Sequence, residues 1–508
     1  MLDALWSSLG QVLEPGTLLL MLVGVGIGFV VGILPGLGGA VTLALMLPFT
    51  FTMEPVEAFA FLLGMSVVTA TTGDITSVLF GVPGEATSAA AVLDGYPLTR
   101  QGQGGRALGA VLSSSTLGAL FGALVLALSI PIMRPLVLLL GPPEFFALTI
   151  LGLTFVVTLS AGNMLKGFVM AVFGLLVALV GLDPQQGVER YTFGQLYLWD
   201  GIGLIPVVVG LFGGAEVLHI MLNKKAIAKS DRDATGQNYP GVMTGVRDSF
   251  QQWRVVLRAS GIGVGIGIVP GLGGTVAQFI AYGQAQQSSK NPEMFGKGAI
   301  DGLVAAGATN NAKDAGSLIP VVAFGIPSGA GSAVLLTAFL IVGLNPGPEM
   351  LTTNLDVTFS MVWVTILANI VAVAIAFAFI KPLTRLTTIS GPLLVPFLVL
   401  LLVFGAYTSS NSFNDVFVML AAAAIGIGCL RWNWPRVPFL LALVLGALAE
   451  RYLFLSYSLF GWSWLGRPGV LLMAGICLLA LLQAGRIKRR AGRAPARTAA
   501  STDQAGTP

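Results

Sequence analysis

The chain carries one glycine-rich stretch twice, as GIGFVVGILPGLGGAV from Gly26 to Val41 and as GIGVGIGIVPGLGGTV from Gly261 to Val276. The two copies align without a gap at an offset of 235 residues and are identical at eleven of sixteen positions. An internal repeat of this kind indicates a duplicated architecture. Each copy is an apolar, glycine-striped segment that runs into Pro-Gly-Leu-Gly-Gly, where a helix should end or unwind. The repeat therefore predicts two related halves, each with a broken helix.

The composition is that of a membrane protein. Of the 508 residues, 55% are hydrophobic and only 10% are charged, and the mean hydropathy is +0.86. A soluble globular domain carries more polar surface. Apolar segments that approach the roughly 20 residues needed to span a bilayer recur along the chain. They lie at 16–34, 107–130, 136–159, 164–182, 202–222, 255–269, 356–380, 393–407, 416–430, 437–453 and 470–482. We expect an all-α polytopic membrane protein with about 10–14 transmembrane helices.

Basic residues gather in two places, a central loop over residues 224–258 and a tail over residues 486–497. Loops rich in Lys and Arg stay in the cytoplasm, so both are expected there. The first fifteen residues hold Asp3 and Glu14 but no Lys or Arg, and so they lack the basic region of a cleavable signal. If the N-terminus lies outside, an odd number of crossings precedes the central loop and an even number follows it. The halves are then inverted repeats, the plan of many secondary transporters.

These features divide the chain into four parts. Residues 1–222 are expected to form the first membrane repeat, and residues 255–484 the second. Residues 223–254 are a cytoplasmic linker, and residues 485–508 are a basic, disordered tail. Nucleic-acid binding by the basic runs is disfavoured, because they flank membrane helices and lack interleaved aromatic residues.

Enzymatic chemistry is poorly supported. The chain has one histidine, His219, and its two cysteines, Cys429 and Cys477, lie in apolar segments without metal-ligand spacing. A catalytic triad or a multi-histidine metal site is therefore not expected, and the only bound ion expected is a coupling proton or sodium ion. The glycine-rich turns follow no β-strand and precede no acidic ribose partner, so they do not fit a dinucleotide fingerprint.

The two Pro-Gly-Leu-Gly-Gly turns, residues 35–39 and 270–274, are named here the first and second glycine turns. Glycines four residues apart precede each of them, which lets another helix approach closely. The turns themselves free backbone N–H and C=O groups, and at membrane depth such groups are tolerated where they line a water-filled cavity. We predict that this cavity binds substrate, with a purely structural kink as the alternative. The predicted residues are Pro35, Gly36, Gly38, Gly39, Pro270, Gly271, Gly273 and Gly274.

A second element is duplicated, Phe-Gly-Val-Pro ending at Pro83 and Phe-Gly-Ile-Pro ending at Pro327, at an offset of 244 residues. Polar residues precede each copy, and a short apolar run and another proline-containing turn follow it. This pattern is typical of a re-entrant hairpin, near residues 72–97 and 309–347. Half-helices beginning at Pro83 and Pro327 would direct their positive dipole ends toward an anionic substrate. Hydroxyl groups of Thr87, Ser88, Ser328 and Ser332 would face the same site.

Polar side chains just before the second hairpin extend the predicted site. Asn310 and Asn311 can donate and accept hydrogen bonds, and so could hold a carboxylate or a cation. Lys313 and Asp314 either form a structural ion pair or meet the substrate or the coupling ion, and Asp74 is a candidate proton or sodium site.

Other acidic residues are given structural roles. Glu85 and Asp94 are expected in loops at a hairpin mouth. Glu216, and Glu450 beside Arg451, are expected to be helix-end or paired charges.

The duplicated PGLGG, the segment GDITSVLFGVPGEATSAAAVLDGYPLTRQGQGG from residue 73, and NPEMFGKGAIDG followed by TNNAKDAGSLIPVVAFGIPSGAGSAVLLTAFLIVGLNPGP resemble one family. It is the TctA-like large permease subunit of tripartite tricarboxylate transporters, and the resemblance spans nearly the whole chain. This chain differs from many relatives at Ala306-Gly307, where they carry Pro-Glu, and at Lys313-Asp314, where they carry small residues.

The resemblance implies a symporter of the bacterial inner membrane that imports a small carboxylate. It implies two partners, a small TctB-like membrane subunit and a TctC-like periplasmic binding protein that delivers the substrate. It also implies that an ion gradient drives uptake. A channel-like permease or a transporter for a different solute is the alternative, and a polytopic membrane enzyme is disfavoured because no convergent acid, base or metal set is present. The substrate site is expected between the two glycine turns and the two hairpins.

Overall fold

The computed structural model describes residues 1–33, 38–158, 164–183, 185–222, 241–270, 272–379 and 391–491. The side chains of residues 220, 273, 391–394 and 483–491 are not described. Pro35, Gly36 and Gly271 lie outside the described residues, as do residues 223–240 of the linker and 492–508 of the tail.

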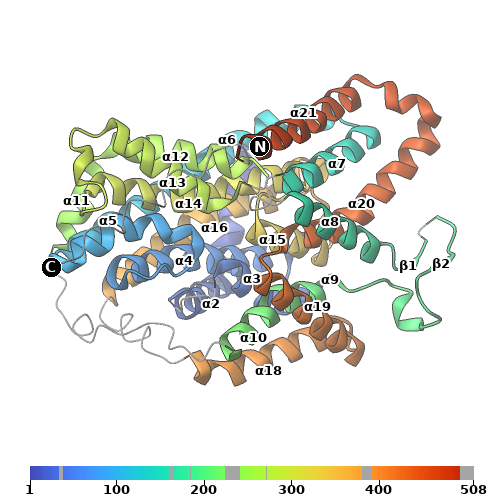
Figure 1. Cartoon of the computed structure of the whole chain (residues 1–508), viewed down its shortest axis with the longest axis horizontal. Coiled ribbons are helices and arrows are strands. Elements are labelled where there is room, and N and C mark those ends of the chain that lie inside the picture. The colour runs from blue at the N-terminus through green and yellow to red at the C-terminus, as the bar shows by residue number, and fades with distance from the viewer. Residues whose placement is uncertain are drawn as a thin grey trace, which may run out of the picture.

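The described chain is almost entirely helical (Figure 1). Six of its helical segments are long and apolar enough to cross a bilayer: α2 (Pro15–Gly32), α4 (Pro55–Phe80), α6 (Gly104–Leu138), α16 (Leu355–Ala378), α19 (Phe413–Arg431), and α20 (Val437–Phe460) with the turn that follows it. Seven shorter apolar segments accompany them. The strands among the described residues are β1 (Gly181–Leu182) and β2 (Glu189–Arg190), a small antiparallel pair. An all-α polytopic membrane protein is thus confirmed.

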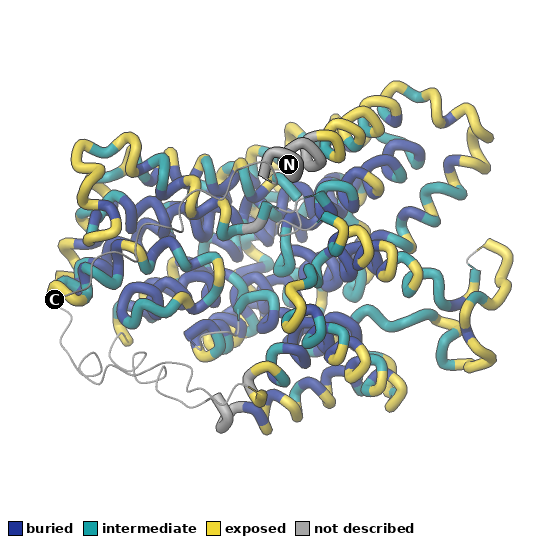
Figure 2. Tube along the Cα trace, in the orientation of Figure 1, coloured by how far each residue is buried: buried dark blue, intermediate teal, exposed yellow. Residues whose placement is uncertain are grey.

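Large apolar side chains cover much of the outer surface. Leu400 on α18 (Gly391–Ser410) is 64% exposed, and Leu472 on α21 (Pro468–Ala491) is 67% exposed. Figure 2 shows the exposed residues along α18, α20 and α21 on the outside of the molecule. Single exposed leucines are ordinary in soluble proteins, but whole helix faces of them need an apolar solvent. These faces suit contact with lipid.

The sequence repeat extends to a repeat of helices. The first half has α2, α3 (Gly39–Met46), α4, α5 (Ala89–Arg100) and α6 in this order. The second half has α12 (Trp253–Ile268), α13 (Gly273–Ser288), α14 (Ile300–Phe324), α15 (Ala330–Ile341) and α16. The first half then adds α7 (Pro142–Thr158), α8 (Met164–Ala178) and the continuous run of α9 (Leu204–Val208), the π-helix η4 (Val209–Gly214) and α10 (Ala215–Leu222). The second half adds α18, α19 and α20.

Each half packs on the other reciprocally. Helix α6 packs on α14, and its counterpart α16 packs on α4. Helix α15 packs on α3, whereas α13 packs on α5 and on the short turn η2 (Ala86–Ser88) before it. Such an exchange of roles is what a twofold relation produces. Inversion of the repeats across the membrane and the side on which each loop lies remain predictions.

The glycine stripes pack helices together, as their four-residue spacing predicts. A Cβ atom at Gly28 on α2 would lie 2.6 Å from the carbonyl oxygen of Met65 on α4. One at Gly263 on α12 would lie 2.9 Å from the carbonyl oxygen of Thr309 on α14. Both distances are too short for any residue larger than glycine.

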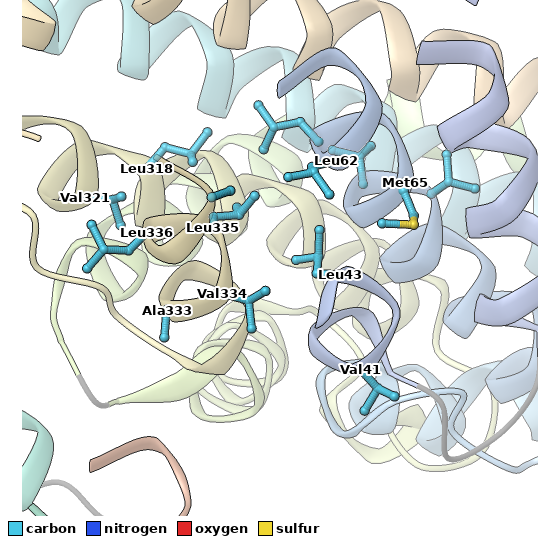
Figure 3. Packing of buried hydrophobic residues seen from close by; sticks show 14 of the residues in the cluster. Val41, Leu43, Leu62, Met65, Leu318, Val321, Ala333, Val334, Leu335 and Leu336 are labelled. Atoms are coloured by element: carbon cyan, nitrogen blue, oxygen red, sulfur yellow. The ribbon is translucent and has the colours of Figure 1, made fainter. Parts of the chain in front are cut away.

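Part of the core where the halves meet is apolar. Figure 3 shows Leu43 of α3 beside Val334 of α15, with Met65 of α4 on one side of this pair and Leu318 of α14 on the other. The rings of Phe59 and Phe339 join the halves nearby, with their centroids 4.4 Å apart. This packing fixes the hairpins of one half against the glycine-turn helices of the other.

The hairpin helices begin later than predicted. Helix α4 is continuous over 26 residues and α14 over 25, each through its polar stretch, and they end at Gly81 (φ 66°) and Gly325 (φ 67°). Pro83 and Pro327 lie in the following turns, and the next α-helices start only at Ala89 and Ala330. The threonines of the polar stretch can be buried inside α4 because their hydroxyls donate to carbonyls one turn earlier, as Thr71 does to Val67 at 3.0 Å. Residues 81–88 and 325–332 are named here the first and second hairpin turns.

The predicted linker and tail also differ from expectation in their described parts. Helix α11 (Val242–Gln251) packs on α6 through the Arg106–Asp248 ion pair at 2.6 Å and a hydrogen bond from Ser113 to Ser249 at 2.8 Å. Helix α21 continues to Ala491, past the predicted start of the tail. Its last residues are rich in Lys, Arg and Ala, which are strong helix formers.

Candidate functional site

A cavity of about 430 Å³ lies between the two halves. Both glycine turns and both hairpin turns reach it, through Gly38 and Gly39, Gly84 to Thr87, Gly274, and Ser328 to Ser332. Helix α14 adds Lys313, Asp314 and Ser317, and three residues from outside these motifs complete the charged and aromatic lining: Phe212, Glu216 and Arg436. Ligand sites for small molecules have volumes of about 300–1,000 Å³. The cavity is therefore large enough for a small organic ion.

The carboxylate of Glu85 connects the first hairpin turn to the first glycine turn. It accepts a hydrogen bond from the backbone N–H of Gly39 at 3.1 Å and another from the hydroxyl of Thr87. The N-terminus of α3, part of the first glycine turn that is predicted to bind substrate, therefore holds a carboxylate of the protein itself. Sequence position alone suggested only a loop residue.

The two hairpin turns are closed in the same way by a serine. The hydroxyl of Ser88 accepts from the backbone N–H of Glu85 at 3.3 Å and donates to its carbonyl at 2.9 Å. The hydroxyl of Ser332 accepts from the N–H groups of Ser328 at 3.0 Å and Gly329 at 2.9 Å. At the repeat offset of 244, Glu85 corresponds to Gly329. The turns thus share a backbone design, but only the first presents a carboxylate.

Lys313 and Asp314 form an ion pair at 2.7 Å on the cavity wall, with the Lys313 side chain 8% exposed. The stem of Lys313 lies against Gly274 of the second glycine turn, where an added Cβ atom would overlap it. The same Cβ atom would lie 2.7 Å from the methyl group of Thr87. The absence of a side chain at Gly274 is what lets the first hairpin turn approach α14.

Asp74, Asn310 and Asn311 form a buried polar cluster between α4 and α14. The amide nitrogen of Asn310 donates to Asp74 at 3.0 Å and to the carbonyl of Ala70 at 3.1 Å. That of Asn311 lies 2.8 Å from the hydroxyl of Ser115, and also within hydrogen-bonding distance of Thr71 and Asn369. Three buried oxygens of this cluster have no hydrogen-bond partner among the described residues: Oδ1 of Asp74, Asn310 and Asn311. The cluster can therefore accept a proton or a small cation.

The predicted site residues separate into two groups. Gly38, Gly39, Thr87, Gly274, Ser328, Ser332, Lys313 and Asp314 line the cavity. Pro83, Ser88, Pro270, Pro327, Asn310, Asn311 and Asp74 are not part of its lining. Gly273 begins α13, and its surroundings are not described. Whether any of these residues binds substrate remains a prediction.

Two acidic residues have other partners than expected. Asp94 is fully buried in α5 and accepts from the N–H groups of Gly296, Gly298 and Ala299 at 2.8–2.9 Å and from the hydroxyl of Tyr282 at 2.9 Å. Glu450 pairs with Arg190 at 2.6 Å rather than with its neighbour in sequence. Asp94 thus fastens the first hairpin to the loop before α14, because two glycines with positive φ turn their N–H groups toward one carboxylate.

Sequence reasoning missed Phe212, Glu216 and Arg436 as cavity residues. Glu216 is an acidic residue inside an apolar segment, a signal of function, but its position near a helix end favoured a structural role. Arg436 lies in the polar connection Trp432 to Arg436 between two apolar helices, where an arginine is ordinary.

A cavity between two repeats with broken helices is the architecture of a membrane transport protein. The chain belongs to the tripartite tricarboxylate transporter TctA family, whose sequence model matches residues 18–441. As a member of a tripartite system it has partner subunits.

Two relatives come from Agrobacterium vitis. The chain is 33% identical over 441 residues to an uncharacterized 52.8 kDa protein in the TAR-I ttuC' 3' region, with 87% of each chain covered. It is 31% identical over 188 residues to an uncharacterized protein in the TAR-II ttuC' 3' region, with 37% of this chain and 78% of the relative covered. No solved structure matches the chain.

Proposed function

We propose that the protein is the large membrane subunit of a secondary transporter that imports a small carboxylate, a tricarboxylate or related organic anion, and that it is not an enzyme. The observation that carries the proposal is the cavity between the halves, which both glycine turns and both hairpin turns reach. Its walls include the basic residues Lys313 and Arg436, and the serine hydroxyls of the second hairpin turn. These donors suit an anion with more than one oxygen-bearing group. The carboxylates of Glu85, Glu216 and Asp314 line the same cavity and would limit how tightly the anion is held.

Transport requires that the cavity open to each side of the membrane in turn. The hairpin turns are the elements suited to move, because each is a short connection between two helices and reaches the cavity. Glu85 holds the first hairpin turn to Gly39, and Thr87 lies against Gly274. Loss of these contacts on one side would uncover the cavity, and their return would close it.

We assign ion coupling to the buried polar cluster, with Asp74 as the proton or sodium site and Lys313–Asp314 as the charged pair between that cluster and the cavity. Asp74 and Asn310 lie on the helices that end in the two hairpin turns. Binding of a proton or cation at the unpartnered oxygens would stabilise one arrangement of α4 against α14. Such a preference is what links an ion gradient to movement of the hairpins.

The partners that this proposal requires are a small TctB-like membrane subunit and a TctC-like periplasmic protein that delivers the carboxylate. The location is the bacterial inner membrane, with the linker and the tail in the cytoplasm. The repeats have opposite orientations, so that each hairpin enters from a different side.

Uptake of labelled citrate and succinate tests the proposal in cells that express the chain with its partner subunits. Wild-type uptake should saturate, require the binding protein and stop when the ion gradient is collapsed. Lys313→Ala should reduce uptake more than tenfold, whereas Lys290→Ala, at an exposed lysine outside the cavity, should not. Non-saturating uptake without the binding protein would indicate a channel-like permease, and absence of carboxylate uptake in the wild type would refute the proposed cargo.

A further inference from the structure

Arg436 is the N-cap residue of α20 and lines the cavity. Its guanidinium has two described contacts, both neutral. One Nη donates to the carbonyl of Leu211 at 3.2 Å, and the group lies over the ring of Phe212 at 5.1 Å from its centroid. The arginine is thus held by the first half although it belongs to the second.

The holder of Arg436 is the π-helix η4, which contains both Leu211 and Phe212. Single π-helical turns inside a helix frequently lie at functional sites. Here the turn packs tightly on α19, because a Cβ atom at Gly214 would lie 2.8 Å from the Cβ atom of Ala423. The guanidinium therefore rests on a fixed support, which lowers the entropy lost when it binds a ligand.

Among the described residues, no carboxylate lies within 4.0 Å of the Arg436 guanidinium. The other basic residue of the cavity lining, Lys313, is already paired with Asp314. An arginine inside a membrane protein is costly unless it is paired. Its planar fork matches a carboxylate through two parallel hydrogen bonds. Arg436 is the cavity cation that is open to an anion.

Glu216 lines the same cavity and lies four residues after Phe212, on the same side of the helix that supports Arg436. Although it lies beyond ion-pair distance, its negative charge attracts the Arg436 guanidinium, so an entering anion must compete with it. The two residues therefore act in opposite directions on a carboxylate ligand.

We propose that Arg436 binds a carboxylate group of the transported anion inside the cavity, and that Glu216 is the counter-charge that weakens this binding. The inference rests on the proposed transport of a carboxylate, and it names the group that recognises it. The alternative is that Arg436 only braces the π-helix.

Direct binding separates these roles without the periplasmic protein. The purified full chain in lipid nanodiscs is titrated calorimetrically with citrate, and then with succinate and its neutral analogue succinamide. Arg436→Gln should weaken citrate binding about tenfold to a hundredfold, the loss expected for a charge-assisted hydrogen bond. It should also reduce the preference for succinate over succinamide. Glu216→Gln should strengthen citrate binding, and Arg431→Gln, at an exposed arginine outside the cavity, should leave it unchanged.

Arg436→Lys keeps the charge but loses the fork, and it decides the question if the glutamine variant does not accumulate. Binding weakened by Arg436→Lys at an unchanged thermal midpoint supports the proposal. Unchanged citrate affinity and unchanged succinate preference in both variants would overturn it. If the purified wild-type protein binds no carboxylate but cells that express it with its partners take up citrate, this inference is overturned and the proposed function is not. Absence of both binding and uptake would refute the proposed function as well.

Discussion

The carboxylate of Glu85 accepts a hydrogen bond from the backbone N–H of Gly39 at 3.1 Å. This contact joins the first hairpin turn to the first glycine turn, and it places a protein carboxylate at a helix N-terminus inside the cavity. Helix N-termini attract anions through their free N–H groups and their dipole. A substrate carboxylate and the carboxylate of Glu85 would therefore compete for the same helix N-terminus.

Glu85→Gln should lower the KM for citrate uptake about two- to fivefold, because an interaction with a helix terminus contributes about 0.3–1 kcal/mol. The amide keeps the size of the side chain and removes its charge. Uptake kinetics at equal membrane abundance measure the effect, with Glu293→Gln at an exposed position as the control. A higher KM would show instead that Glu85 shapes the site by positioning the turn.

Gly274→Ala should abolish most uptake. The added methyl group would overlap the stem of Lys313 and approach Thr87, so the first hairpin turn could not close against α14. The matched control is Gly283→Ala on the same helix, where an added Cβ atom meets nothing within 4 Å. Uptake at saturating citrate and membrane abundance should be measured for both. Equal activity of the two variants would contradict close packing at this turn.

Asp74→Asn should separate gradient-driven uptake from exchange. If Asp74 carries the coupling ion, net uptake driven by the gradient should fall more than tenfold, whereas exchange of labelled for unlabelled citrate across proteoliposomes should persist. The substitution preserves side-chain size in a fully buried position. An equal loss of uptake and exchange would assign Asp74 a structural role.

Asp94→Ala should destabilise the protein by roughly 3 kcal/mol or more, because three backbone N–H groups and the hydroxyl of Tyr282 lose their acceptor. Asp94→Asn keeps one acceptor oxygen and should fall between this variant and the wild type. Thermal unfolding in detergent gives the order. A melting midpoint for Asp94→Ala equal to that of the wild type would show that the contact contributes little.

The sequence predicts the close packing of helices well, and it predicts the positions of the charged cavity residues less well. The glycine spacing of α2 and α12 indicates close helix packing because only one residue type permits it, and the structure confirms this at Gly28 and Gly263. The start of α5 could not be read in the same way. Proline is a common first residue of a helix, which favoured a helix start at Pro83. In the structure the hydroxyl of Ser88 and the backbone of Glu85 close a separate turn, and α5 begins only after it.

The cavity lining shows the same division. Gly38 and Gly274 belong to a motif that can be recognised because it occurs twice in the sequence. Arg436 belongs to no motif, and only the reciprocal packing of the halves brings its connection beside the π-helix. No periodicity along the chain records a contact between residues so far apart. Asn310 and Asn311 were found by their polarity, yet their surroundings place them in the helix interface behind the cavity wall.

Reciprocal packing also determines when the cavity can form during synthesis of the protein. The hairpin of each half rests on the glycine-turn helix of the other, and the wall that carries Arg436 is the start of α20. During translation the first half therefore enters the membrane with its hairpin turn uncovered, and the cavity is complete only when almost the whole chain has left the ribosome. Neither half forms the cavity by itself, because its wall is built from residues of both.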